Sequence, residues 1–217
     1  MLVPIFPLKL VVFPTEDLNL HIFEERYKEL ITDANNEGIS FMIPAFLDDT
    51  IMPIATEVRL KSIEKVHPDG KMDVRVKGGS TIFRILDVYQ NVPEKLYSGA
   101  EVEALDYTNE RDLAVAAEII EYIKELYQVL NINKPIPAYP EKVWTFQLGH
   151  LVGLSTEQEY ELLSIPSEKE RQIMMLEHLE QLLPTVKEME ELRRKAKLNG
   201  HFRRFSSPDF LRGLEKK

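Results

Sequence analysis

The spacing of apolar residues changes once along the chain, near Tyr107, and this change constrains the fold more than any other feature. Before Tyr107, apolar side chains alternate with polar ones, as in Ile54–Leu60 and Met72–Lys77, which is typical of half-buried β-strands. After Tyr107 they recur every third or fourth residue, which places one apolar stripe along a helix. The sequence therefore predicts an α+β fold in which strands come first and helices follow.

The same change predicts the domain organisation. We expect a β-rich domain over residues 1–107, a helical bundle over residues 108–200 and a basic, mobile tail over residues 201–217. One helix is expected inside the β-rich part, from about Glu24 to Asn36, because acidic residues occupy its first turn, where the helix dipole favours them. No repeat or low-complexity segment divides the chain further.

Several local signals place individual turns and helix ends. The segment His67-Pro68-Asp69-Gly70 predicts a hairpin turn, because proline presets a turn dihedral and glycine accepts a positive φ. Ser155–Gln158 and Ser167–Glu170 read as capping boxes that open two helices. A short helix is expected over Glu141–Leu151, and Pro184 is expected to kink or split the longest helix.

Composition excludes several classes of function. The chain has 217 residues and no cysteine, so thiolate nucleophiles, disulfides and cysteine-ligated metals are excluded. A net charge of −9 argues against nucleic-acid binding. The apolar start Met1–Pro7 lacks a basic region and is broken by prolines, and no apolar run approaches the ~20 residues of a membrane span. We therefore expect a cytoplasmic protein without a signal peptide and without membrane association.

No motif indicates catalysis. Neither a G-x-x-x-x-G-K-[ST] loop nor a G-x-G-x-x-G loop occurs, and no G-x-S-x-G elbow surrounds a serine. No two histidines have the spacing of metal ligands. The five are His21, His67, His150, His178 and His201. We therefore expect a non-enzyme with no catalytic residue, no metal and no cofactor.

The charge is unevenly distributed. Residues 187–217 carry ten Lys or Arg and five acids, a net charge of +5, so the remainder carries −14. A basic tail on an acidic body is a candidate interaction segment, or simply a solvated helix end. The candidate partner-binding residues of this tail are Arg203, Arg204, Phe205 and Phe210.

The N-terminal third carries a distinctive signature. It consists of Pro4-Ile5-Phe6-Pro7-Leu8, then Val12-Phe13-Pro14, then Leu20-His21-Ile22-Phe23-Glu24-Glu25-Arg26-Tyr27. This run resembles the opening of the Lon protease N-terminal domain family. Gly70–Gly78 followed by Phe83-Arg84-Ile85 is similar to a strand pair of the same family.

The resemblance extends, more loosely, into the helical half, and covers about residues 2–200. It implies a strongly twisted, PUA-like β domain, a pseudo-barrel with one helix, followed by a C-terminal helical bundle. It also implies recognition of polypeptides. The ATPase and Ser–Lys protease domains of a full Lon protease are absent from this sequence, and Thr15 stands where the family often has glycine.

The signature itself is expected to form core rather than a binding site. Its large side chains are expected to be buried, with Glu24 and Arg26 orienting the helix. These side chains are Phe6, Leu8, Phe13, Ile22, Phe23 and Tyr27.

A receptor for unfolded chains needs exposed apolar surface or an open strand edge. Two apolar, proline-broken loops are the candidates, with buried loop packing as the alternative in each case. The first contains Pro44, Phe46, Leu47 and Met52, and methionine suits variable partners. The second contains Ile136 and Tyr139, close in sequence to Trp144.

Three functions remain open from the sequence. The leading hypothesis is a non-catalytic module that binds unfolded or partly folded polypeptides, possibly as an adaptor in protein quality control. The second is an assembly subunit that docks one folded protein partner through its last helix and tail. The third is a small-molecule binder or cryptic enzyme in a cleft between the β and helical parts.

Overall fold

The structure is a computed structural model that describes the backbone of residues 1–205 and the side chains of residues 1–196. Two compact units can be distinguished. The first comprises Met1–Asp112 and Val143–Met174, and the second comprises Leu113–Lys142 and the chain from Met175 onward. The domain boundary expected near residue 107 stays a prediction.

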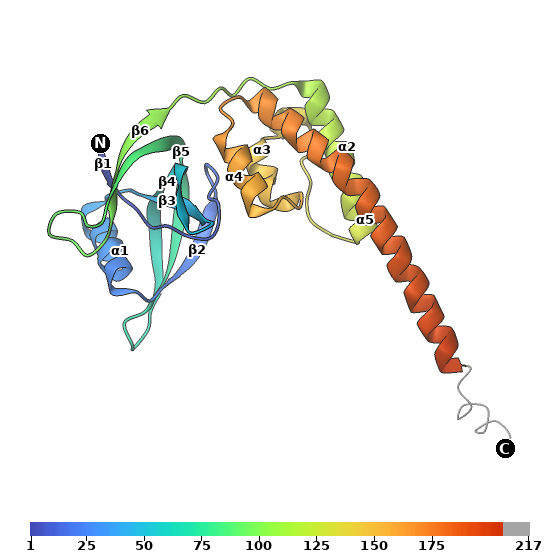
Figure 1. The fold of residues 1–217 in the computed structure, drawn as a ribbon, viewed down its shortest axis with the longest axis horizontal. Helices are drawn as coiled ribbons and strands as arrows, with labels where there is room; N and C mark the ends of the chain where they lie inside the picture. Colours follow the sequence, from blue (N-terminus) through green and yellow to red (C-terminus); the bar gives the residue numbers. More distant parts are fainter. Residues whose placement is uncertain (206–217) are drawn as a thin grey trace, which may run out of the picture. The chain divides into compact units, whose positions relative to one another are not determined.

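The first unit is built on an antiparallel sheet, shown in Figure 1. Its strands are β1 (Leu2–Pro4), β2 (Asp17–Ile22), β3 (Phe41–Leu47), β4 (Thr50–Val66), β5 (Met72–Tyr89) and β6 (Gly99–Leu105). The order is β1-β6-β5-β4-β3, and β2 pairs with β5. Register shifts interrupt the pairing of β4 with β5, and such bulges increase the twist of a sheet. The mixed α+β fold with a twisted sheet is confirmed.

The path of strands is open, but the N-terminal segment contacts both of its edges. β1 pairs with β6, and the residues after β1 form isolated parallel bridges with β3, Ile5 to Met42 and Leu8 to Ala45. The Phe6 N–H donates to the Met42 carbonyl at 2.8 Å. The N-terminal segment therefore connects β6, on which β1 pairs, to β3 at the other end of the strand order.

The core lies between the sheet and helix α1 (Glu25–Glu37), which packs beside it in Figure 1. Phe6 stacks on Tyr27 of α1, with ring centroids 3.8 Å apart. Phe13 and Ile22 are also buried, and Leu8 is half-buried against this core. These side chains confirm the expected role of the signature.

Phe23 is the exception, and its expected burial was wrong because its side chain is 60% exposed. It follows β2, whose last residue, Ile22, is buried. Since successive residues of an extended chain point to opposite faces, burial of Ile22 directs Phe23 outward.

The β4–β5 hairpin has the predicted turn. The His67 N–H donates to the Lys71 carbonyl at 2.8 Å, and the Gly70 N–H donates to the His67 carbonyl at 2.9 Å. Gly70 has a φ of +80°, which a side chain would oppose. The turn chemistry of His67–Gly70 therefore fixes where β4 ends and β5 begins.

Short helices complete the first unit. The helix expected over residues 141–151 is instead three short pieces. The 3-10 turn η1 (Pro140–Lys142) belongs to the second unit, and α3 (Thr145–Leu148) and the 3-10 turn η2 (Gly149–Leu151) belong to the first. The next helix, α4 (Thr156–Ser164), has the predicted capping box at Ser155.

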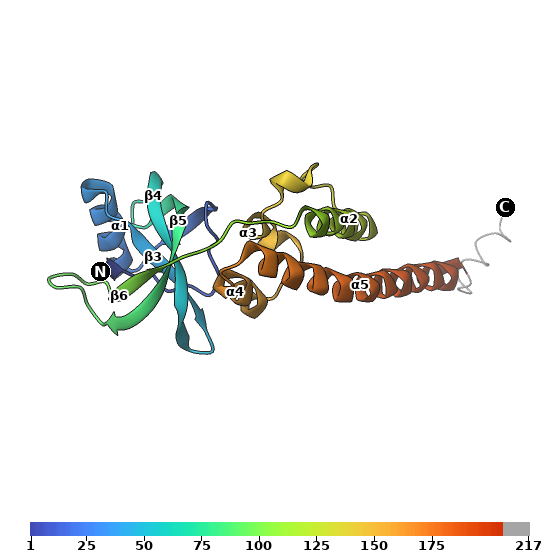
Figure 2. The same cartoon turned by 90° about the horizontal axis from the view of Figure 1, so that it is seen from above.

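The second unit pairs α2 (Leu113–Leu130) with the greater part of α5 (Glu168–Phe205), and the two helices run side by side in Figures 1 and 2. The buried faces supply the apolar stripe that the sequence predicted. The buried side chains are Ala116, Ile119, Ile120, Ile123, Leu126 and Tyr127 of α2 with Met175, Leu179 and Leu183 of α5. Helix α5 continues through Pro184, so the chain is not split there. None of the described helices combines the length and apolar character that crossing a membrane requires.

Candidate polypeptide-binding groove

A buried ion pair fixes the helices of the first unit. Arg171 and Glu168 at the start of α5 each have side chains that are 1% exposed, and Arg171 Nη2 lies 2.8 Å from Glu168 Oε2. Glu168 also accepts from the N–H and the hydroxyl of Thr145, at 3.0 and 2.8 Å. Arg171 donates further to the Ile165 carbonyl at 2.5 Å. The pair therefore ties the start of α5 to the start of α3.

The Arg171 guanidinium also supports an aromatic cluster. It lies 4.1 Å from the centroid of the Phe146 ring and 5.4 Å from that of Tyr107. The Tyr107 hydroxyl donates to the Leu163 carbonyl at 2.5 Å, and burial raises the pKa of Tyr107 to about 12. Tyr107 therefore stays neutral at physiological pH. The rings of Tyr107 and Phe146 form one side of a groove, and neither ring carries a charge.

The groove has a volume of about 470 Å³ and lies wholly within the first unit. Tyr107, Trp144 and Phe146 form its aromatic part, and all three are half-buried. The Arg111 guanidinium stacks 3.9 Å from the centroid of Trp144 and so restrains the indole. The complete lining is Pro14, Thr15, Ser80, Thr81, Ile82, Ala104, Leu105, Asp106, Tyr107, Asn109, Trp144, Phe146 and Gln147.

The groove adjoins an open strand edge. β1 pairs with residues 99–101 of β6, and the Val102 N–H donates to the Met1 carbonyl at 3.0 Å. Backbone groups of alternate residues point to the same side of a strand, so the N–H and C=O of Ala104 face the side that β1 occupies farther along. Among the described residues, no strand pairs with Glu103–Leu105 on that side.

His150 connects helix α4 to the segment that precedes β2. Its Nε2 lies 3.2 Å from Glu16 Oε2 and its Nδ1 lies 2.7 Å from Glu159 Oε1. The hydrogen bond to Glu16, with that to Glu159, raises the pKa of His150 to about 9. The same Glu16 oxygen accepts from the Phe13 N–H at 2.9 Å. A protonated His150 therefore bridges two carboxylates that belong to different segments.

This bridge predicts a pH dependence of stability. A pKa that is higher in the folded state than the usual 6.5 stabilises the fold fully below pH 6.5, and the stabilisation is lost as the pH rises through about 9. We expect the free energy of unfolding to fall over this window in the wild type and to fall less in His150→Gln. Urea unfolding at several pH values measures both, and parallel pH profiles would contradict the assignment.

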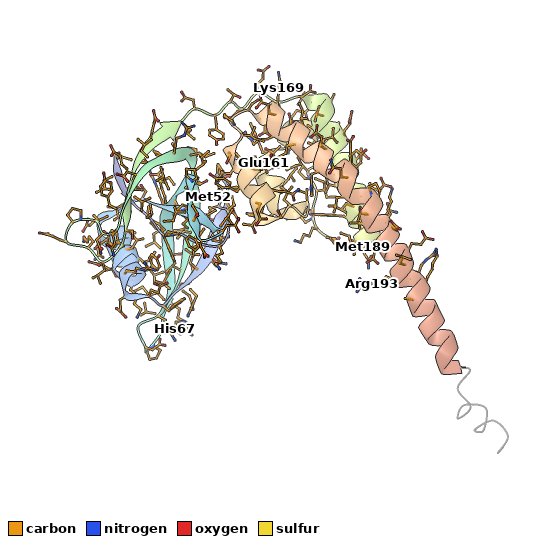
Figure 3. The ribbon with its side chains drawn as sticks, viewed as in Figure 1. Met52, His67, Glu161, Lys169, Met189 and Arg193 are labelled. Atoms are coloured by element: carbon orange, nitrogen blue, oxygen red, sulfur yellow. The ribbon has the colours of Figure 1, made fainter. Side chains whose placement is uncertain are left out.

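The structure places the sequence-predicted loop residues in several settings. Pro44, Phe46 and Leu47 belong to β3 and Met52 to β4, so this segment is not a loop, as was expected, but a hairpin with Asp48-Asp49 as its turn. Proline is tolerated there because the register shifts between Pro44 and Phe46. Figure 3 labels Met52.

The exposure of these residues differs. Pro44 is buried, whereas Phe46, Leu47 and Met52 are half-buried. Phe46 and Leu47 line a hollow of about 400 Å³ beside Asp48 and Asp49. Their role as a binding surface stays a prediction.

The remaining candidates lie elsewhere. Ile136 and Tyr139 belong to the second unit, where Ile136 is half-buried and Tyr139 is 59% exposed. The tail candidates lie outside the residues whose side chains are described. These are Arg203, Arg204, Phe205 and Phe210.

The model of the family "ATP-dependent protease La (LON) substrate-binding domain" matches residues 2–181. The chain belongs to this family.

Solved structures agree with this assignment. A Lon N-terminal domain protein from Xanthomonas campestris is 26% identical with a TM-score of 0.57, and the match covers 85% of this chain and 98% of that one. The N-terminal domain of Mycobacterium avium complex Lon protease is 16% identical with a TM-score of 0.62, over 83% of this chain and 98% of that one, and shows the fold alone. A comparison with curated proteins finds no match.

Proposed function

We propose that this chain binds unfolded or partly folded polypeptides and that the groove beside β6 takes an extended, apolar segment of the client. The observation that carries the proposal is the position of an aromatic groove next to an unpaired strand edge. Membership of a substrate-binding family supports polypeptides as the ligand class.

The chemistry of the groove suits this ligand. An added strand pairs its backbone with the open N–H and C=O of Ala104, and this pairing is independent of the client's sequence. Alternate client side chains then reach Trp144 and Phe146, where aromatic burial supplies affinity. Asp106 is the one charged side chain in the lining, so a neutral segment meets little desolvation cost.

We further propose that the chain acts as an adaptor in protein quality control, without catalysis of its own. Asp106 and Tyr107 are the ionisable side chains in the lining of this groove, and the Tyr107 hydroxyl already donates to the Leu163 carbonyl. Binding rather than bond cleavage is therefore the proposed activity.

Two substitutions in the groove test the binding site. We expect Trp144→Ala to weaken peptide binding by about 2 kcal/mol, roughly thirtyfold, because a tryptophan that a bound partner covers is a typical hot spot. Gln147→Glu introduces a carboxylate into the groove, and a bound client would remove water from it. We expect the binding free energy to weaken by about 1–2 kcal/mol. Fluorescence anisotropy with a labelled, uncharged, apolar and unstructured peptide measures both dissociation constants.

The matched control is Gln90→Glu, which makes the same chemical change at an exposed position outside the groove. We expect its affinity to equal that of the wild type. Equal losses in Gln90→Glu and Gln147→Glu would attribute the effect to net charge, and an unchanged affinity in Trp144→Ala would remove the groove from the account.

The predicted loop residues remain a second proposed surface. Phe46→Ala tests the hairpin hollow in the same assay, and Tyr139→Ala tests the exposed ring of the second unit. A larger loss in Phe46→Ala than in Trp144→Ala would move the site to the residues around Phe46, Leu47 and Met52.

A further inference from the structure

Three side chains with metal-ligating atoms meet at one end of the sheet. His21 lies in β2, His67 opens the β4–β5 turn, and Asp73 lies in β5. His21 Nδ1 lies 2.7 Å from Asp73 Oδ1, and His67 Nε2 lies 2.7 Å from Asp73 Oδ2. One ligand atom from each residue lies within 4.8 Å of the other two. Figure 3 shows His67 at the tip of the hairpin.

The backbone frame holds these three positions in register. His21 and Asp73 are directly opposite each other in the β2–β5 ladder. His67 is fixed by the turn hydrogen bonds to Lys71 and Gly70. The two imidazole rings lie 5.7 Å apart in an edge-to-face arrangement. Only side-chain rotations are therefore needed to bring the three ligand atoms around one centre.

The donor set suits a borderline divalent cation. Two imidazole nitrogens and one carboxylate oxygen form a common three-ligand set for zinc, which leaves a further position for water. His21 and Asp73 are 53% and 41% exposed at their side chains, so an ion reaches the site from solvent.

We propose that His21 Nδ1, His67 Nε2 and the Asp73 carboxylate form a binding site for a divalent transition-metal ion such as Zn²⁺. The ion lies between the imidazoles and the carboxylate in place of the present hydrogen bonds, each neutral imidazole carries its proton on its other ring nitrogen, and water completes the coordination. Zinc at this position links β2 to the β4–β5 turn and stabilises the fold by an amount that rises with the logarithm of the free zinc concentration above the dissociation constant.

One neighbouring charge opposes the metal and supplies a second test. Lys65 of β4 is directly opposite Asp73 in the β4–β5 ladder, so both residues lie on one face of the sheet. Its side chain is exposed. Removal of this positive charge in Lys65→Gln strengthens binding, on the order of two- to tenfold at low ionic strength.

The experiment is a calorimetric titration of Zn²⁺ into the full chain, treated with EDTA and free of any histidine tag, at pH 7.5. We expect one zinc per chain. His21→Ala and His67→Ala should each weaken binding by more than tenfold, because a direct ligand matters more than an outer-shell partner, whose loss costs roughly 10- to 100-fold. Titration with Co²⁺ gives an independent spectroscopic readout of nitrogen and oxygen coordination.

His178→Ala is the matched control, since it removes a histidine on α5 outside the cluster. Its zinc affinity should equal that of the wild type. The proposal is overturned by absence of saturable binding to the wild type, or by equal affinities of wild type and His21→Ala. Tighter zinc binding by Lys65→Gln supports the proposal, because misfolding of the variant would weaken binding and not strengthen it. Weaker zinc binding by Lys65→Gln contradicts the proposal.

Discussion

Replacement of Arg171 by methionine should lower the free energy of unfolding of the first unit by about 3–5 kcal/mol, because it leaves a buried carboxylate without its cation. Glu168 is 1% exposed and points at Arg171 and Thr145. Methionine keeps the length of the aliphatic chain, so the loss reports the charge rather than a large cavity. Urea unfolding followed by Trp144 fluorescence measures the change.

A second substitution separates the ion pair from the packing. The double variant Arg171→Met with Glu168→Gln should be more stable than the two single losses together predict, since no buried charge is left unpaired. Arg193→Met is the control, because Arg193 pairs with Glu190 on an exposed part of α5 and should change stability by less than about 0.5 kcal/mol. A loss below about 1 kcal/mol in Arg171→Met would show that the pair does not hold α5 to α3.

Gly149→Ala is expected to destabilise the first unit by about 2–3 kcal/mol, through steric overlap alone. A Cβ at this position would lie 2.3 Å from Cε2 and 2.6 Å from Cζ of Phe13. Phe13 is completely buried, and its ring already packs against Phe146 and His150, so a shift of the ring disturbs these contacts. The φ and ψ of Gly149 are both −49°, a conformation that alanine adopts freely, so backbone strain does not contribute. Thermal unfolding measures the loss.

Replacement of Phe13 by a smaller side chain tests whether the steric overlap causes the loss of stability. In the double variant Gly149→Ala with Phe13→Leu, the leucine leaves room for the new methyl group, so the combined loss should be smaller than the sum of the single losses. Additive losses would mean that the two residues do not press on each other. The close approach would then not be the reason for glycine at position 149.

Much of the fold could be predicted because it depends on local patterns. The alternation in Met72–Lys77 and the turn at His67–Gly70 each act over a few residues, and the structure confirms both. The prediction of one helix over residues 141–151 was wrong because a contact between distant residues decides the structure there. The chain is extended at Trp144, and the Thr145 N–H donates to Glu168, 23 positions later, instead of to a carbonyl one helical turn earlier, so a tertiary contact outweighs local helix propensity.

The family departure at Thr15 acquires a physical reason from the structure. Thr15 has a φ of +65°, in the left-handed region that favours glycine. A β-branched side chain is strained there. The family resemblance implies glycine at this position, and the left-handed backbone gives the physical reason.

The groove could not be predicted, because its lining comes from four separate parts of the chain. These are residues 14–15, 80–82, 104–109 and 144–147. Taken singly, these residues resemble ordinary core or surface positions. Arg171 was equally hidden, because an arginine on a charged helix is usually exposed, and its partner Thr145 lies 26 positions earlier. The apolar segment around Phe46 stood out instead because its residues are consecutive.

Trp144 allows the most direct measurement of the central claim, since it is the only tryptophan in the chain and lies in the groove. The measurement is its fluorescence emission during titration with an unfolded, tryptophan-free polypeptide, with binding followed in parallel by anisotropy of a label on the client. Occupation of the groove removes water from the indole, so we predict a saturable blue shift with the same midpoint as the anisotropy. Binding without any change in Trp144 emission, or no binding at all, would contradict the proposal that this groove receives polypeptides.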